Sequence, residues 1–341
     1  MQSEIRRIQL TGGATLTVSL PKNWARDIGL RQGDHVVLTL QPDGSILITP
    51  KKLIRKKEKE REAIIKAERN LDAEAVVREV IAYYLVGYNV IKVIFGKGVE
   101  EQREFIKSVI RQKTIGLEVM EESADEIVFR SFISYADFPL REALVRMGVI
   151  TSLMIKDVLK ALKEFNKSLA QEINRRDDNV DRLYLFIVRQ LKFAVRNIAI
   201  VSKMGLRNPR DCLGYRLIVK SVERVADHAA RIAKLISGFE SPLEKDILKL
   251  ILEMGDKSLK IFEDSLKSFF GLDIKLAHKL IGEVTFVTRY EQEITEKILS
   301  NEKLNIREIT NTKLILESLR RIADYGADIA EIAINLAIEE P

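Results

Sequence analysis

The stretch VERVADHAARIAKLI, residues 222 to 236, has a second version in LRRIADYGADIAEIA, residues 319 to 333. Both place apolar residues three and four positions apart, which is typical of an amphipathic helix. Both also contain an Ala-Asp pair, at Asp227 and at Asp324. Such a repeat indicates that one structural unit is present twice.

The residues around each copy predict three helices per half. The helical spacing runs over residues 143–164, 169–195 and 212–236 in the first half, and over 243–270, 277–300 and 311–337 in the second. A region of this length is too long for one three-helix unit and right for two. The sequence therefore predicts an all-α body of two tandem three-helix bundles, at residues 140–239 and 242–341.

The helices of the first half carry carboxylates in pairs four residues apart. Asp177 and Asp181 form one pair, with Asp178 beside it, and Glu223 and Asp227 form the other. Residues at i and i+4 share a helix face about 6 Å apart, and facing carboxylate pairs in helical bundles hold hard cations. We expect a divalent or transition metal ion there, with Mg, Mn, Ca, Fe and Zn as candidates. The alternative is a surface cluster balanced by neighbouring Lys and Arg.

The last helix of the second half departs from this pattern. Asp324 aligns with Asp227, and Asp328 follows it by one turn. Four residues before Asp324, however, Arg320 stands at the position of Glu223. Half of that carboxylate pair is therefore replaced by a cation.

The preceding helix of the second half loses one carboxylate as well. Glu291 aligns with Asp181, but Val287 stands at the position of Asp177. Two readings stay open for this half. The remaining carboxylates hold a second metal ion, or Arg320 neutralises them through an internal ion pair. The candidate metal ligands of the second half are Glu291, Asp324 and Asp328.

The motif ERVADHA, residues 223 to 229, resembles the PhoU family of phosphate-uptake regulators. Members of that family read Glu-Arg-Ile-Ala/Gly-Asp-His/Tyr-Ala at the same place, and the resemblance covers about residues 140 to 338. It implies two symmetric three-helix bundles whose helices carry Glu/Asp-x-x-x-Asp pairs. It also implies a role in phosphate uptake, with a phosphate ABC transporter or another phosphate transporter as a partner.

The N-terminal residues have a different character. IRRIQLTGGATLTVSL, residues 5 to 20, predicts two short strands, PKNWARDIGL a short helix, and HVVLTLQPDGSILITP a hairpin turning at Pro42, Asp43 and Gly44. Residues 1 to 69 hold 14 Lys and Arg against 8 Asp and Glu, a difference of +6 that equals the net charge of the whole chain. A basic N-terminal region on an otherwise neutral chain favours a polyanionic partner, and nucleic acid is the first candidate.

Residues 1–52 resemble the swapped-hairpin fold of AbrB, MazE and SpoVT. The elements Leu20-Pro21-Lys22, Gly33-Asp34 and Asp43-Gly44 fall in the family's order. The resemblance implies a small β domain in which two chains interleave to bind DNA, so that we expect a homodimer or higher oligomer. By resemblance, the candidate DNA-binding residues are Arg6, Arg7, Lys22, Asn23 and Arg26. The alternative is a head that only dimerises.

Two segments connect the head to the body. KKLIRKKEKEREAIIKAER, residues 51 to 69, is rich in charge and predicts a solvated linker helix over residues 53–71. Residues 72–138 predict a small α/β domain with helices and strands in alternation. The chain is thus expected to be a multidomain α+β protein.

Several classes of function are disfavoured. A single cysteine, Cys212, leaves no intramolecular disulfide and fits a reducing cytoplasm. No apolar run reaches the ~18 residues that a membrane helix needs, and no catalytic or nucleotide-binding motif is present. We expect a non-enzymatic, cytoplasmic regulator of phosphate uptake that binds DNA and does not insert into membranes. The alternative is an adaptor without DNA binding that docks on a transporter or a signalling kinase.

Overall fold

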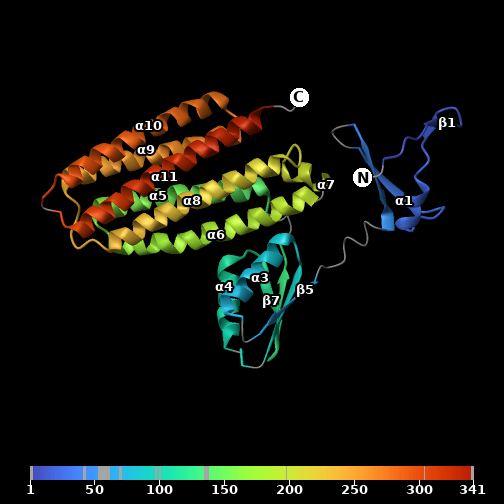
Figure 1. Ribbon diagram of the computed structural model, residues 1–341, viewed down its shortest axis with the longest axis horizontal. Coiled ribbons are helices and arrows are strands. Elements are labelled where there is room, and N and C mark those ends of the chain that lie inside the picture. Colours follow the sequence, from blue (N-terminus) through green and yellow to red (C-terminus); the bar gives the residue numbers. More distant parts are fainter. Residues whose placement is uncertain are drawn as a thin grey trace. The chain divides into compact units, whose positions relative to one another are not determined.

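The chain divides into two compact units, the head at residues 1–60 and a larger unit at residues 61–341. Figure 1 shows the helices and strands of both units. The computed structural model describes residues 3–40, 44–52, 62–68, 71–96, 98–99, 101–133, 138–196, 198–302 and 304–338.

The head consists of two hairpins and one short helix. Its elements are β1 (Gln9–Thr11), β2 (Thr15–Thr17), α1 (Lys22–Asp27), β3 (Val36–Leu40) and β4 (Ile46–Pro50). β1 pairs antiparallel with β2, and β3 with β4. These elements confirm the predicted order of strands, short helix and hairpin. Pro42 and Asp43 of the predicted turn lie outside the described residues, whereas Gly44 has a φ of 79°, a conformation that favours glycine.

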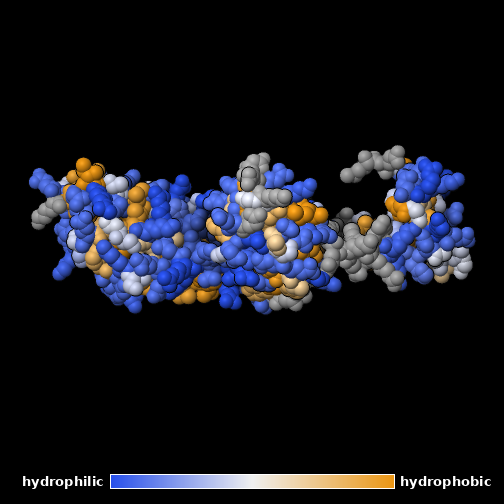
Figure 2. Space-filling view, turned by 90° about the horizontal axis from the view of Figure 1, so that it is seen from below, coloured by the Kyte–Doolittle hydropathy of each residue, from blue (hydrophilic) through white to orange (hydrophobic). Residues whose placement is uncertain are grey.

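The head lacks a hydrophobic core within one chain. Pro50 is the one buried residue among its described residues. The β3–β4 register pairs Leu38 with Ile48 and Leu40 with Ile46, so that one face of this hairpin is apolar along its length. Leu38 and Leu40 are 61% and 78% exposed. Figure 2 shows such hydrophobic residues on the surface of the head.

An α/β domain opens the larger unit. Its elements are β5 (Glu62–Ala67), α3 (Ala73–Val86), β6 (Val90–Phe95), α4 (Gln102–Lys113), β7 (Leu117–Glu122) and β8 (Glu126–Ser131). The sheet has the order β5-β6-β8-β7, in which only the β5–β6 pair is parallel. Asp72 caps α3 by accepting a hydrogen bond from the Ala75 N–H, and Gly87 ends the helix in the left-handed conformation. The predicted helices and strands from Ala73 onward are confirmed.

The predicted linker helix is wrong where it overlaps β5. Residues 62–67 form a strand, and Ala63, Ile65 and Ala67 point into the core while the residues between them are exposed. This alternation with period two is the strand signal. The dense charge of the preceding residues concealed it. The α/β domain therefore begins at Glu62 and not at residue 72, and residues 53–61 of the predicted linker lie outside the described residues.

Two three-helix bundles form the body. The first contains α5 (Leu140–Glu164), α6 (Lys167–Arg196) and α8 (Asp211–Ser237), with α7 (Ile198–Val201) and the short 3-10 helix η1 (Ser202–Met204) between the last two. The second contains α9 (Lys245–Gly271), α10 (Ile274–Leu299) and α11 (Ile306–Ala337). The predicted pair of three-helix bundles is thereby confirmed. α11 begins earlier than expected because Asn305 and Glu308 form a capping box.

One continuous core joins the two bundles, which lie side by side in Figure 1. α8 packs on α11 and α5 packs on α9. At the α5–α9 crossing Gly148 faces Leu266, and Gly255 faces Leu159 in the same way. The matched contacts follow from the internal repeat. None of the described helices combines the length and apolar character that a membrane span requires.

Candidate metal centre

A cluster of three carboxylates lies between α6 and α8 of the first bundle. Asp181 comes from α6, and Glu223 and Asp227 come from successive turns of α8. One oxygen of each lies within 4.8 Å of the others. Among the described residues, no other group of three His, Cys, Asp or Glu side chains comes so close together.

The other two predicted ligands of the first bundle lie beside this cluster. Asp177 is near enough for Asp181 and Asp227 to influence its pKa, but it is not one of the three grouped carboxylates. Asp178 turns to the α/β domain, where its Oδ2 accepts a hydrogen bond of 2.7 Å from the Gln112 side chain. The structure thus brings together three of the five candidates and sends Asp178 to a different partner.

Burial and mutual repulsion both act on the cluster. Burial raises the pKa of Asp177 to about 7, and the Asp181 and Asp227 carboxylates add to the shift. Burial, followed by Glu223 and Asp227, raises the pKa of Asp181 to about 6. The pKa of Asp227 is raised by burial and then by Glu223. These carboxyl groups therefore lack enough positive charge around them.

Two cations of α8 border the cluster on its solvent side. Lys220 Nζ lies 2.5 Å from Glu223 Oε2, and Arg224 Nη1 lies 3.4 Å from Asp227 Oδ2. Their side chains are 33% and 49% exposed. These two cations neutralise part of the negative charge of Glu223 and Asp227, as the alternative of a surface cluster balanced by Lys and Arg requires. Asp181, however, has no ion pair among the described contacts.

The donor set suits a hard divalent cation. All three groups offer carboxylate oxygens, which Mg²⁺, Mn²⁺ and Ca²⁺ prefer. His228 is not one of the grouped residues. Its ring lies beside Tyr325, at a centroid distance of 5.9 Å. Burial there lowers the pKa of His228 to about 4, which keeps the ring neutral.

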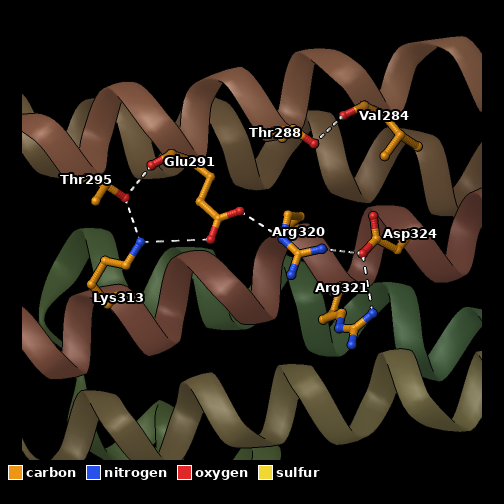
Figure 3. A network of polar contacts seen from close by, with 8 residues as sticks. All are labelled: Val284, Thr288, Glu291, Thr295, Lys313, Arg320, Arg321 and Asp324. Atoms are coloured by element: carbon orange, nitrogen blue, oxygen red, sulfur yellow. Dashed lines mark hydrogen bonds and ion pairs between the residues drawn. The ribbon is translucent and has the colours of Figure 1, made fainter.

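The second bundle arranges the equivalent residues differently. Figure 3 shows the Arg320 guanidinium between two carboxylates, with Nε 2.8 Å from Glu291 Oε2 and Nη1 2.7 Å from Asp324 Oδ2. This contact is the internal ion pair that the sequence left open as an alternative. Asp328 stands one turn further along α11, and its pKa is raised by burial and by Glu331.

Sequence reasoning missed the arginines that hold the α/β domain against the body. Arg182 donates from Nε to the Thr114 carbonyl at 3.1 Å, and Arg196 donates to the Val86 carbonyl at 3.1 Å. Arg189 donates to the carbonyls of Tyr84 and Tyr88, at 3.2 Å for Tyr88. These carbonyls lie at the C-terminal ends of α3 and α4, where unpaired acceptors and the negative end of the helix dipole favour a cation.

The spacing of these arginines is the signal that could have revealed the contact. Arg182, Arg189 and Arg196 repeat at intervals of seven residues, which places them on one face of α6. The metal candidate Asp181 is the immediate neighbour of Arg182. The α/β domain therefore docks on the helix that supplies one side of the acidic cluster.

The predicted DNA-binding residues lie on two parts of the head. Arg6 and Arg7 precede β1 and are exposed, with Arg6 paired to Glu4. On α1, Lys22, Asn23 and Arg26 are all exposed. Their spacing of one and four residues places the three side chains on one face of the helix.

Comparison with known proteins relates the two units to different families. The PhoU domain model matches residues 144–236 and 251–333, which is more than half of the chain. The model of the antidote-toxin recognition protein MazE, a bacterial antitoxin, matches residues 9–56.

Curated relatives match more than half of the chain. A phosphate-specific transport system accessory protein PhoU homolog of Clostridium acetobutylicum is 27% identical over 58% of this chain and 90% of its own. The homolog of Aquifex aeolicus is 28% identical over 58% of this chain and 89% of its own. The names of these relatives describe accessory proteins of phosphate-specific transport, in agreement with the regulatory role expected from the sequence.

Solved structures show the same fold for the body. The phosphate transport system regulatory protein PhoU from Streptococcus pneumoniae aligns with a TM-score of 0.51 and 23% identity, over 58% of this chain and 92% of that chain. PhoU from Pseudomonas aeruginosa gives the same TM-score and identity over 94% of that chain. Because the PhoU domain model matches two stretches that together exceed half of the chain, this protein belongs to the PhoU family.

Proposed function

We propose that the protein is a cytoplasmic, DNA-binding regulator of phosphate uptake. The observation that carries the proposal is the joining, in one chain, of a PhoU body to a basic head that matches the MazE model. A body whose relatives are accessory proteins of phosphate transport supplies the signal. The head gives that signal access to a promoter.

The head works as a dimer in this proposal. Its apolar β3–β4 face, with Leu38 and Leu40 exposed, has no cover within the described part of one chain. A hairpin of this size is unstable in water unless its apolar face is packed. A second head supplies such a surface, and two copies related by a two-fold axis present their basic residues as a pair.

The body binds a divalent metal ion at Asp181, Glu223 and Asp227. The three grouped carboxylates and their excess of negative charge support this site. The ion supplies the positive charge that the cluster lacks. A phosphate transporter is the expected partner of the body, because the curated relatives serve phosphate-specific transport systems.

Binding to DNA can be tested directly. Fluorescence anisotropy of the full chain is measured on a labelled phosphate-transporter promoter and on a scrambled duplex, across salt concentrations. The matched variant carries Lys22→Glu and Arg26→Glu on the exposed face of α1. We expect preference for the promoter, a steep loss of affinity with salt, and loss of binding in the variant.

The opposite result has a clear meaning. A full chain that binds neither duplex at low salt contradicts the DNA-binding part of the proposal. The head is then a dimerisation device, and the protein is an adaptor that acts on a transporter or a signalling kinase.

A further inference from the structure

The two bundles of the body place different charges at the same position. Asp181, Glu223 and Asp227 of the first bundle correspond to Glu291, Arg320 and Asp324 of the second. Each trio takes its first member from the middle helix of its bundle and the other two from successive turns of the last helix. The presence of Arg320 at the position of Glu223 is therefore a local difference between two bundles that share the same arrangement of helices.

The Arg320 side chain occupies the space between the two carboxylates. It contacts Glu291 through Nε and Asp324 through Nη1, at 2.8 Å and 2.7 Å (Figure 3). The three side chains are 28%, 18% and 26% exposed, so water screens these pairs only in part. A guanidinium stays protonated at all relevant pH values, and its planar fork suits two carboxylates at once.

Further cations surround this arrangement. Lys313 Nζ lies 4.0 Å from Glu291 and Arg321 Nη1 lies 3.7 Å from Asp324. Lys313 also donates to the Thr295 hydroxyl at 2.7 Å, which fixes its direction. Two carboxylates thus face three cations, the reverse of the charge balance in the first bundle.

The fourth position of the second bundle carries no oxygen ligand. Val287, which corresponds to Asp177, is fully buried. An entering metal ion has to displace Arg320, meet the repulsion of Lys313 and Arg321, and bind with fewer oxygen ligands. Each of these three effects lowers the affinity of the second bundle for a divalent cation.

We propose that Arg320 is a built-in cation that takes the place of a metal ion in the second bundle. The comparison of the two halves rests on the metal site proposed for the first bundle. The role of Arg320 in the second bundle does not depend on that site. The body is then asymmetric: its first half responds to metal, and its second half keeps a fixed charge arrangement whether or not metal is present.

Charge exchange between the two positions tests this inference. The full chain is stripped with EDTA, saturated with Mn²⁺ and desalted, and bound metal per chain is measured by elemental analysis and by titration calorimetry. The variants are Arg320→Glu, Glu223→Arg and the double exchange, which preserves the net charge. Arg307→Glu, an exposed change near the start of the same helix, is the matched control.

Each variant has a defined expectation. The unchanged chain and Arg307→Glu bind one Mn²⁺ per chain, Arg320→Glu binds two, Glu223→Arg binds none, and the double exchange binds one. A folded Arg320→Glu chain that binds no more Mn²⁺ than the unchanged chain overturns the inference. So does an unchanged chain that binds two ions, one of which is lost in Glu291→Gln.

The measurement separates this inference from the proposed first-bundle site. An unchanged chain with no bound Mn²⁺, together with one ion in Arg320→Glu, removes the first-bundle site but sustains the role of Arg320. Circular dichroism in EDTA establishes folding. If Arg320→Glu does not fold, Arg320→Gln replaces it: it removes the cation without adding charge, and a gain or lack of Mn²⁺ at saturation decides in the same way.

Discussion

Asp181 is a partly buried carboxyl group whose surroundings disfavour its negative charge. Its pKa in the folded chain is about 6, against an ordinary value of 3.8, because burial and the Glu223 and Asp227 carboxylates disfavour its ionised form. The folded state therefore holds the proton more tightly than the unfolded state. Without metal, the free energy of unfolding falls as pH rises from about 4 to about 6, because folding then requires a charged group in an unfavourable place.

Replacing Asp181 with Asn removes this cost and keeps the shape of the side chain. In EDTA at pH 7.5 we expect Asp181→Asn to raise the free energy of unfolding by about 1 kcal/mol, after allowance for solvent screening. Near pH 4 the change has little effect, because Asp181 is then protonated in the folded state. Urea denaturation at the two pH values measures the difference, with Glu172→Gln, an exposed change on the same helix, as the control. Equal effects at both pH values would contradict this account.

The spacing of the carboxylates was enough to find the grouped residues, but it did not show which of the five candidates would come together. The four-residue intervals on α6 and α8 identified Asp181, Glu223 and Asp227. They could not separate these residues from Asp178, because the difference depends on Gln112 of a domain packed from outside the bundle. The contact between Asp178 and Gln112 cannot be recognised from the four-residue spacing of the carboxylates.

Gly326 determines how closely α11 approaches α9. A Cβ at this position would lie 2.9 Å from Ile261 Cγ2 and 3.3 Å from the backbone of Ile261 and Phe262. The backbone of a packed helix cannot move aside as a flexible side chain can. We expect Gly326→Ala to lower the free energy of unfolding by about 1 to 3 kcal/mol, despite the better helix propensity of alanine. Urea denaturation followed by circular dichroism measures the change.

Gly282 provides the control for this prediction. It also lies inside a helix, α10, but no heavy atom would come within 4 Å of its Cβ. Gly282→Ala should therefore raise the free energy of unfolding by up to about 1 kcal/mol through helix propensity alone. If both alanines stabilise the chain, close packing at Gly326 is not a constraint.

Arg189 connects the α/β domain to α6. Its guanidinium lies 4.6 Å from the centre of the Tyr84 ring and also donates to the Ser131 hydroxyl at 3.3 Å. Arg189→Leu removes the Arg189 donor from the Tyr84 and Tyr88 carbonyls, and the Tyr84 carbonyl keeps only the Gly87 N–H. We expect faster hydrogen exchange in α3, with α9 unchanged as the internal control. Equal protection in both proteins would show that this arginine does not hold the domain.

At the level of elements, helices were predicted more reliably than the first strand of the α/β domain. Long apolar periodicity marks the six long helices of the body, α5, α6, α8, α9, α10 and α11, because each buries one face along many turns. β5 offers only Ala63, Ile65 and Ala67 as an alternating apolar set, directly after a run of Lys, Arg and Glu. Its parallel partner β6 lies beyond α3 in the sequence, so that local pattern alone gave little indication of the strand.

At the scale of the whole molecule, the exposed apolar face of β3 and β4 determines the expected assembly. Leu38 lies on this face, whereas its neighbour Val37 points to the opposite one. If two heads bury the face against each other, Leu38→Lys introduces a charge into the dimer core. Val37→Lys adds the same charge on the same strand but outside that core.

Light scattering at micromolar concentration distinguishes these outcomes. We expect the unchanged chain and Val37→Lys to have the mass of at least two chains of 38.9 kDa, and Leu38→Lys to have half the mass of the unchanged chain. The helical body should stay folded in both variants, since the head forms a separate unit. Promoter affinity should fall in Leu38→Lys, because a single head makes only half of the phosphate contacts. A Leu38→Lys chain that keeps the mass and affinity of the unchanged chain would place the subunit interface elsewhere.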